Sequence, residues 1–370
     1  MSLLFISSSI KWCFSKTTAI EHIGFQMFLA NNTIELTVVL CAYNEKNHIS
    51  HAITSLYEEI GNNMSVELVI IDNESEDDTY KIAKSVLDDL KFDNAIVFSI
   101  VHCPLTSSRN TGLEKARGRY IGYVDADGYV KPGWYDSLKR AIDDDVDIFC
   151  GSVGIDPAVS GFSKLIYELH YMPSLGVANI PLIGANMGFR TDLINSVGGF
   201  HELPTGRGDE TLLLYILSQY SKDLIVKSDS SSIVVNSYAS NLFTWLKIQF
   251  AEGKSGAYIS RNSLVSYMLG YLFKSANVCF VPLCAMFMVI GSDYFFLPFS
   301  LFFIRHIKRW GYYKRSLSFN KVLHTKPKEL FILLLGSIAA DLGFICNLVV
   351  RKPSFRRADV SEIIRNYQYE

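Results

Sequence analysis

The ten residues from Tyr120 to Tyr129 constrain the fold of this 370-residue chain more than any other stretch. They begin with a run of strand-forming residues, Tyr-Ile-Gly-Tyr-Val, which ends at Asp125 and Asp127, two carboxylates one residue apart, followed by Gly128. An apolar run bounded by acids and a glycine predicts a buried strand that stops where the acids begin. Because ligands of open α/β sheets bind beyond the carboxyl ends of the strands, the two acids are expected in a ligand site.

Two carboxylates at such an edge suit a particular class of metal ion. Mg²⁺ and Mn²⁺ prefer hard oxygen donors, retain several waters and take further ligands from the phosphates of a substrate. We therefore predict that Asp125 and Asp127 hold Mn²⁺ or Mg²⁺ and, through it, a diphosphate. The alternative is that Asp-Ala-Asp-Gly is only a polar turn, since short acidic turns are common.

The flanking sequence repeats a plan of apolar strand, polar loop and helix. Predicted strands cover residues 36–41, 67–71, 95–101, 120–124 and 146–150, and predicted helices cover residues 46–60, 82–90, 107–116 and 132–142. Strands that alternate with helices in this way are typical of an α/β fold. We expect a doubly wound, mostly parallel sheet with flanking helices, whose loops converge on one edge.

Charge divides the chain into regions. Residues 35–262 carry 19 Lys and Arg against 30 Asp and Glu, a net charge of −11, whereas residues 263–370 carry 14 against 6, a net charge of +8. For a chain of this length about two structural units are expected. We predict an N-terminal extension at 1–34, an α/β domain at 35–262 and a basic, apolar region at 263–370. No nucleic-acid partner is expected.

The basic region contains the long apolar runs. Residues 275–292 and 294–304 are uncharged, and residues 330–350 are interrupted only by Asp341. A membrane-spanning helix needs about 20 mostly apolar residues, so the first and third runs qualify. Eight basic and no acidic residues lie between Arg305 and Lys328, which by the positive-inside rule places this loop, and the α/β domain, in the cytoplasm. The alternative is that these runs form buried helices of a soluble protein.

The seven scattered cysteines contain no Cys-x-x-Cys pair, which fits a reduced compartment rather than a zinc ribbon or a disulfide framework.

Three further residues lie in the loops expected at the ligand edge. The Tyr43 ring can stack on a nucleobase, and the Asp72 carboxylate can accept a hydrogen bond from a ring N–H, so together they could read a uracil-like base. Arg109 follows a Ser-Ser pair that opens a helix, where it could neutralise a phosphate. The alternatives are an ordinary loop tyrosine, a turn or helix-capping aspartate and an exposed surface arginine.

A later acid pair, Asp209 and Glu210, follows the glycine-rich stretch Gly206-Arg-Gly and begins a predicted helix. Small residues such as those at 184–190 and 206–208 allow close approach of the backbone to a substrate. The alternative reading of the acid pair is that it only complements the helix dipole.

Four ordered motifs within residues 35–260 resemble the family 2 glycosyltransferases of GT-A fold. The family's first strand with Tyr-Asn-Glu is matched by Val38 to Glu45, and its Asp-rich second loop by Ile71 to Thr79, which reads Ile-Asp-Asn-Glu-Ser-Glu-Asp-Asp-Thr. Its Arg-Asn-x-Gly is matched by Arg109 to Gly112, and its Asp-x-Asp by Asp125 to Asp127. The resemblance implies a metal-dependent transferase that uses a nucleotide-sugar donor and a glycan or lipid-linked acceptor.

The resemblance also implies roles for individual residues. The donor-binding set is Tyr43, Glu45, Asp72, Arg109 and Asp125, the metal-binding pair is Asp125 and Asp127, and the catalytic pair is Asp209 and Glu210. The family writes Glu-Asp where this chain has Asp209-Glu210, and the second acid of the family pattern aligns with Glu210, which we favour as the general base. The Gln-x-x-Arg-Trp motif of processive synthases is absent, because Gln249 is followed by Phe-Ala-Glu-Gly.

In the implied reaction a carboxylate takes the proton of an acceptor hydroxyl while the metal stabilises the departing diphosphate, and direct displacement inverts the anomeric centre. Two other classes of protein remain open at this point. A sugar-nucleotidyltransferase would be expected to carry a glycine-rich, basic loop after the first strand, which Cys41-Ala-Tyr-Asn-Glu is not. A non-catalytic membrane scaffold could have kept the fold and lost the activity.

Overall fold

The computed structural model describes residues 34–171, 182–203, 207–221 and 223–260, with the isolated positions 332, 335, 336, 338–340, 342, 343 and 346. The chain divides into two compact units. The first consists of Met1–Gly154, Leu182–Glu202 and Leu213–Asn236, and the second of Ile155–Pro181, Leu203–Leu212 and Ser237–Glu370. The predicted extension at 1–34 lies outside the described residues except for Ile34, and the predicted boundary at 262 stays a prediction.

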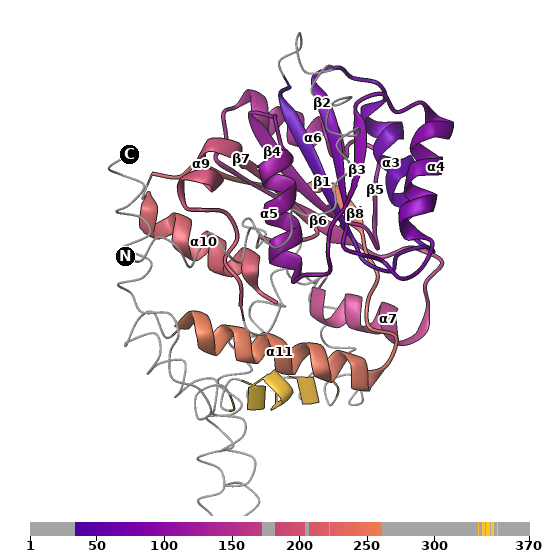
Figure 1. Ribbon diagram of the computed structural model, residues 1–370. Helices are drawn as coiled ribbons and strands as arrows, with labels where there is room; N and C mark the ends of the chain where they lie inside the picture. The colour runs from indigo at the N-terminus through magenta and orange to yellow at the C-terminus, as the bar shows by residue number, and fades with distance from the viewer. Residues whose placement is uncertain are drawn as a thin grey trace, which may run out of the picture. The chain divides into compact units, whose positions relative to one another are not determined.

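The first unit is built on one mixed sheet of eight strands (Figure 1). The strands are β1 (Leu36–Ala42), β2 (Val66–Asp72), β3 (Ala95–Ser99), β4 (Tyr120–Asp125), β5 (Tyr129–Val130), β6 (Ile148–Gly154), β7 (Asn186–Arg190) and β8 (Val226–Val235), in the order β3-β2-β1-β4-β7-β6-β8-β5. Strands β3, β2, β1 and β4 are parallel, as expected from the sequence. The other half is mixed, because β7 runs antiparallel to both β4 and β6.

Helices cover both faces of the parallel half (Figure 1). They are α3 (Ile49–Ile60), α4 (Thr79–Leu90), α5 (Leu105–Lys115) and α6 (Trp134–Asp143), and the short α9 (Thr191–Ser196) follows β7. Val38 and Leu40 of β1 belong to one hydrophobic cluster with residues of α3, α4 and α6. Val39 points to the other face, where a Cβ on Gly112 of α5 would lie 2.4 Å from its Cγ1. The glycine therefore lets α5 lie directly on β1.

The glycine-rich stretch before Arg190 is a strand, which the sequence did not reveal. Its Gly188 lies where a Cβ would be 3.1 Å from Leu138 and 3.4 Å from the Phe149 side chain. The close approach at this glycine is therefore to side chains of the protein's own core. Small residues here make room for β7 to insert between β4 and β6.

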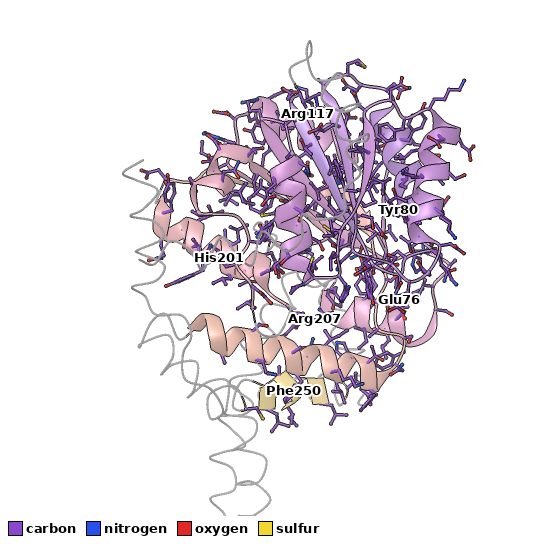
Figure 2. The ribbon with its side chains drawn as sticks, viewed as in Figure 1. Glu76, Tyr80, Arg117, His201, Arg207 and Phe250 are labelled. Atoms are coloured by element: carbon purple, nitrogen blue, oxygen red, sulfur yellow. The ribbon has the colours of Figure 1, made fainter. Side chains whose placement is uncertain are left out.

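The edge of the sheet where the parallel strands begin is closed by a buried ion pair. Glu67, which is 2% exposed, accepts hydrogen bonds from the Thr37 hydroxyl at 2.5 Å and from the Arg117 guanidinium at 2.7 Å. Figure 2 shows Arg117 at this end of the unit and Glu76, in the loop after β2, toward the other. Because every oxygen of Glu67 has a partner, this acid is a structural residue.

The second unit contains α7 (Gly161–Ile166), a π-helical turn (Tyr167–Tyr171), the start of α10 (Asp209–Tyr220) and α11 (Leu242–Ser260). Ile166, Trp245 and Ile332 form its small hydrophobic cluster. The division between the two units falls within α10, after Leu212.

No helix formed by the described residues has the length and apolar character needed to cross a membrane. The predicted apolar runs at 275–292 and 294–304 and the basic loop at 305–328 lie outside the described residues. Of the run at 330–350, only isolated positions are described.

Candidate active site

The predicted site loops of the first unit begin side by side at the carboxyl edge of the parallel strands. Ala42 of β1 pairs with Asp72 of β2, and Cys41 of β1 pairs with Asp125 of β4. The loop that carries Tyr43 therefore starts beside both Asp72 and Asp125. The strand pairing thus brings together residues that lie more than 80 positions apart in the sequence.

Arg109 is the cation of this edge, and it is buried rather than exposed at the surface. Its side chain is 4% exposed, and its Nη2 lies 3.4 Å from Asp125 Oδ1 and 3.3 Å from the Gly184 carbonyl oxygen. The guanidinium also stands over the Phe200 ring, with 5.5 Å to the centroid. The surface-arginine alternative is wrong, and so is the expected position at the helix start, because α5 begins at Leu105. Arg109 holds Asp125 in place.

Asp127 is the acid of the pair whose pKa is raised. Burial, which disfavours the charged form, and the nearby carboxylates of Asp125 and Glu45 together raise its pKa from 3.8 to about 7, while His48 opposes the shift. Glu45 in turn lies 2.8 Å from the Nδ1 atom of His48. Three carboxyl groups thus lie near one another here, and a divalent cation would stabilise their charged forms.

The carboxylates at this edge of the sheet suit a metal ion that takes only some of its ligands from the protein. Across the described ranges no group of three or more His, Cys, Asp or Glu side chains is placed to hold a metal ion. Two carboxylates are what Mg²⁺ or Mn²⁺ takes from a protein when waters and substrate phosphates supply the other ligands. Asp125 and Asp127 fit that arrangement.

Asp72 has an unused hydrogen-bond acceptor. The residue is 2% exposed, and its Oδ2 accepts from the Ser99 hydroxyl at 3.3 Å and from the Ser75 N–H at 3.4 Å. Its Oδ1 is buried and has no hydrogen-bond partner among the described residues. A buried carboxylate oxygen without a donor is costly, so the site is complete only when something else donates to it. Asp72 caps no helix, since α4 begins at Thr79.

A set of hydrogen bonds joins the loop after β1, the first loop, to the loop after β2, the second loop. These bonds were not predicted from the sequence. The Asn44 N–H donates to Ser75 Oγ at 3.0 Å, and Asn44 Oδ1 accepts from the Glu76 N–H at 2.8 Å. The Glu45 N–H donates to Thr79 Oγ1 at 2.7 Å. These bonds fix the backbone after Tyr43 and after Asp72. The signal was Asn44 in the loop after β1 together with Ser75 and Thr79 after β2, since short polar side chains of this kind are prone to bond nearby backbone.

A second unpredicted contact joins α5 to the loop after α9. The Asn110 amide donates to the Phe200 carbonyl at 2.8 Å and accepts from the Phe200 N–H at 2.8 Å. Gly199 adopts a φ of +79°, and a Cβ there would lie 2.5 Å from Asn110 Oδ1. These two hydrogen bonds hold Phe200 in the position where its ring faces the Arg109 guanidinium.

The acid pair of the second unit begins α10, as predicted. Asp209 is 3% exposed, whereas Glu210 is partly exposed. The preceding turn is tied to α11, because Ser255 Oγ donates to the Arg207 carbonyl oxygen at 2.7 Å. Both acids lie in the first helical turn, so both complement the helix dipole, and Glu210 is the more exposed residue of the two.

The raised pKa of Asp127 predicts a pH dependence of stability in metal-free protein. A carboxyl group whose pKa rises from 3.8 to about 7 on folding binds a proton more tightly in the folded state. Its contribution to stability is therefore complete below about pH 4 and is lost as the pH rises through about 7. Urea unfolding in EDTA at pH 5 and pH 8 should show that Asp127→Asn gains stability relative to wild type at the higher pH. The exposed Asp78→Asn serves as control, and an unchanged difference between wild type and Asp127→Asn at the two pH values would contradict the assignment.

Comparison with known proteins places the site residues from Tyr43 to Asp127 within a recognised domain. Residues 37–197 match the model of the family described as "Glycosyl transferase family 2". The chain is 29% identical over 121 residues to an uncharacterised glycosyltransferase, YibD, of Escherichia coli K12, a match that covers 32% of this chain and 34% of YibD. It is 30% identical over 95 residues to the E. coli protein "UDP-Glc:alpha-D-GlcNAc-diphosphoundecaprenol beta-1,3-glucosyltransferase WfaP", covering 25% of this chain and 36% of WfaP.

The chain thus spans about a third of the length of these curated relatives. Among solved structures, the mannosyltransferase PcManGT from Pyrobaculum calidifontis, in complex with GDP-Man and Mn²⁺, superposes with a TM-score of 0.60 at 14% identity, covering 90% of this chain and 95% of that one. This likeness concerns the fold. The family match, the fold and the loop geometry together support a family 2 glycosyltransferase domain of GT-A-like fold over residues 37–197.

Proposed function

We propose that the protein is an inverting glycosyltransferase that moves a sugar from a nucleoside-diphosphate donor to a hydroxyl of an acceptor. The observation that carries this proposal is the row of carboxylates at one edge of the sheet. Asp72 offers one buried oxygen that has no partner among the described residues, and Asp125 and Asp127 lie together two strands away. A nucleoside diphosphate bound to a divalent cation provides a ring N–H that can donate a hydrogen bond to Asp72. It also provides a cation that can bind Asp125 and Asp127.

At the base end, the chemistry of Asp72 favours uracil. One of its oxygens is already used by Ser99 and Ser75, so a single acceptor is left. The Watson–Crick edge of uracil carries one ring N–H, which one acceptor satisfies, whereas guanine presents two adjacent N–H groups. Tyr43, at 40% exposure, provides an accessible ring on which the base can stack. Glu45 completes the donor-binding set next to Asp127.

At the diphosphate end, Asp125 and Asp127 would hold the metal, which neutralises the charge that develops on the departing diphosphate. Arg109 acts on the donor through Asp125, whose orientation it holds from a buried position. Its guanidinium, 3.4 Å from Asp125 Oδ1, fixes this carboxylate at the end of β4, where it is available as a metal ligand.

The first test is metal-dependent cleavage of the donor. Wild-type protein with Mn²⁺ should hydrolyse or transfer from a UDP-sugar, and EDTA should abolish the reaction. Asp127→Asn should lower turnover by a factor on the order of 10² or more, because one metal ligand is lost, while its circular dichroism spectrum stays that of the folded wild type. Asp78→Asn, on the exposed end of α4, is the matched control. Full activity in EDTA, or in Asp127→Asn, would rule out this role of the metal pair.

For the general base we propose Glu210. It is more exposed than Asp209, so it is the member of the pair that an acceptor hydroxyl can reach. Asp209, at 3% exposure, is the member better suited to complement the dipole of α10. The turn before them is anchored by the Ser255 hydrogen bond, which gives the pair a fixed starting position within the second unit.

A base acts on the acceptor, so its removal should affect turnover and leave donor binding intact. Glu210→Gln should lower turnover by a factor on the order of 10² or more with little change in the Kd of UDP, and Asp209→Asn should be milder. Steady-state kinetics with titration of UDP measure both quantities. A normal turnover in Glu210→Gln together with a large loss in Asp209→Asn would assign the base to Asp209 instead.

We also propose attachment to a membrane through residues 264–350, with the catalytic domain in the cytoplasm and a lipid-linked saccharide as acceptor. The apolar runs and the eight-charge basic loop between them support the attachment and its orientation. WfaP, which is named for transfer to a diphosphoundecaprenol-linked sugar, supports the acceptor class.

This attachment predicts how the full-length protein fractionates. It should sediment with membranes and resist extraction by high salt, because apolar insertion is insensitive to ionic strength, and detergent should release it. A chain truncated after residue 262 serves as the comparison. Recovery of the full-length protein in the soluble fraction without detergent would contradict the proposal.

A further inference from the structure

A histidine that no sequence motif singled out lies against the proposed base-stacking tyrosine. Strand β2 separates β1 from β3 in the sheet. Tyr43 follows β1 and His102 lies just beyond β3, yet their rings meet with centroids 4.5 Å apart and an interplanar angle of 41°. The contact therefore spans the end of β2. Asp72, with its unpartnered Oδ1, is the last residue of that strand.

His102 is held in this position by the loop after β2. Its N–H donates to Glu74 Oε2 at 2.9 Å, and its ring Nδ1 lies 3.2 Å from the Asn73 carbonyl oxygen. Asn73 also clamps the next residue, because its side chain accepts from the Cys103 N–H at 2.9 Å and donates to the Cys103 carbonyl at 2.8 Å. A carbonyl oxygen can only accept, so Nδ1 carries the hydrogen that it shares with Asn73. The ring is thus fixed in both position and tautomer.

Tyr43 lacks such support from the core. Its side chain is 40% exposed, and an exposed tyrosine loses rotamer freedom when a ligand stacks on it. A neighbouring ring that already holds Tyr43 lowers that cost and widens the aromatic surface. Tyr43 and His102 follow the strands on either side of β2, which ends at Asp72, so a base stacked on Tyr43 would lie near the end of β2.

We propose that His102 is a positioning residue of the donor site, which holds the Tyr43 ring as a stacking surface for the nucleobase. The inference rests on the proposed function and deepens it, because it assigns His102 to recognition of the base and not of the diphosphate. The two parts of a nucleotide can therefore be used to separate its role from a general structural one.

The test compares ligands with and without a base. Titration calorimetry in Mn²⁺ measures the binding of UDP, GDP and inorganic pyrophosphate to wild type, His102→Ala, His102→Phe and the neighbouring control Val101→Ala. His102→Ala should weaken binding of the nucleoside diphosphate that wild type prefers by about tenfold and leave pyrophosphate binding unchanged. His102→Phe keeps a ring against Tyr43 and should stay within about threefold of wild type. Val101→Ala, at a side chain 41% exposed in the same loop, should match wild type.

Two results would overturn the inference. One is nucleoside-diphosphate binding by His102→Ala that equals wild type, and the other is an equal loss of pyrophosphate binding, which would show a general effect on the fold. If wild type itself binds neither UDP nor GDP, the proposed function fails and the inference fails with it. Failure of the inference alone leaves wild-type nucleotide binding intact, so the two failures are distinguishable.

Discussion

Strand β1 hydrogen bonds on both sides to parallel neighbours, and the rest of the site depends on that register. Ala42 pairs with Asp72 and Cys41 pairs with Asp125, so Asp72 and Asp125 end their strands level with the start of the loop that carries Tyr43. Strand β1 is buried almost throughout, which makes a shift in register costly, since a slip of one residue would turn its apolar side chains to the wrong face. The core therefore determines the spacing of the polar residues at its edge.

The acids at the two ends of the parallel strands differ in how well the protein satisfies them. Glu67, where the strands begin, is satisfied by Thr37 and Arg117 and needs nothing more. At the other edge, Asp72 has an oxygen without a donor among the described residues, and Asp127 has a pKa raised to about 7. Among the described residues, Arg109 is the buried cation next to these carboxylates. This contrast between satisfied and unsatisfied acids separates a structural ion pair from a site that is completed by a cationic or hydrogen-bond-donating ligand.

The loops that carry the site are held by hydrogen bonds to one another as well as by the sheet. Asn44, in the loop after β1, hydrogen bonds to the loop after β2 through both its backbone and its side chain. Asn73, in the loop after β2, hydrogen bonds to the loop after β3 through its side-chain amide. The second loop is thereby tied on both sides, and the Tyr43 and His102 rings meet across it. Such ties reduce the entropy that would otherwise be lost when a ligand orders the loops.

The sequence by itself determined the parallel half of the fold and the position of its acids. Apolar β-branched runs ending in Asp72 and Asp125 have a clear strand pattern, and the structure confirms β1, β2, β3 and β4 close to the predicted bounds. It did not reveal β7, with its central glycine, because the strand state of such a segment comes from its neighbours in the sheet. Only the tertiary structure decided that Arg109 is buried against Asp125, that one oxygen of Asp72 lacks a donor and that His102 meets Tyr43. Each of these contacts depends on residues that strand order and helix packing bring together. Local sequence patterns do not indicate which distant residues will become neighbours.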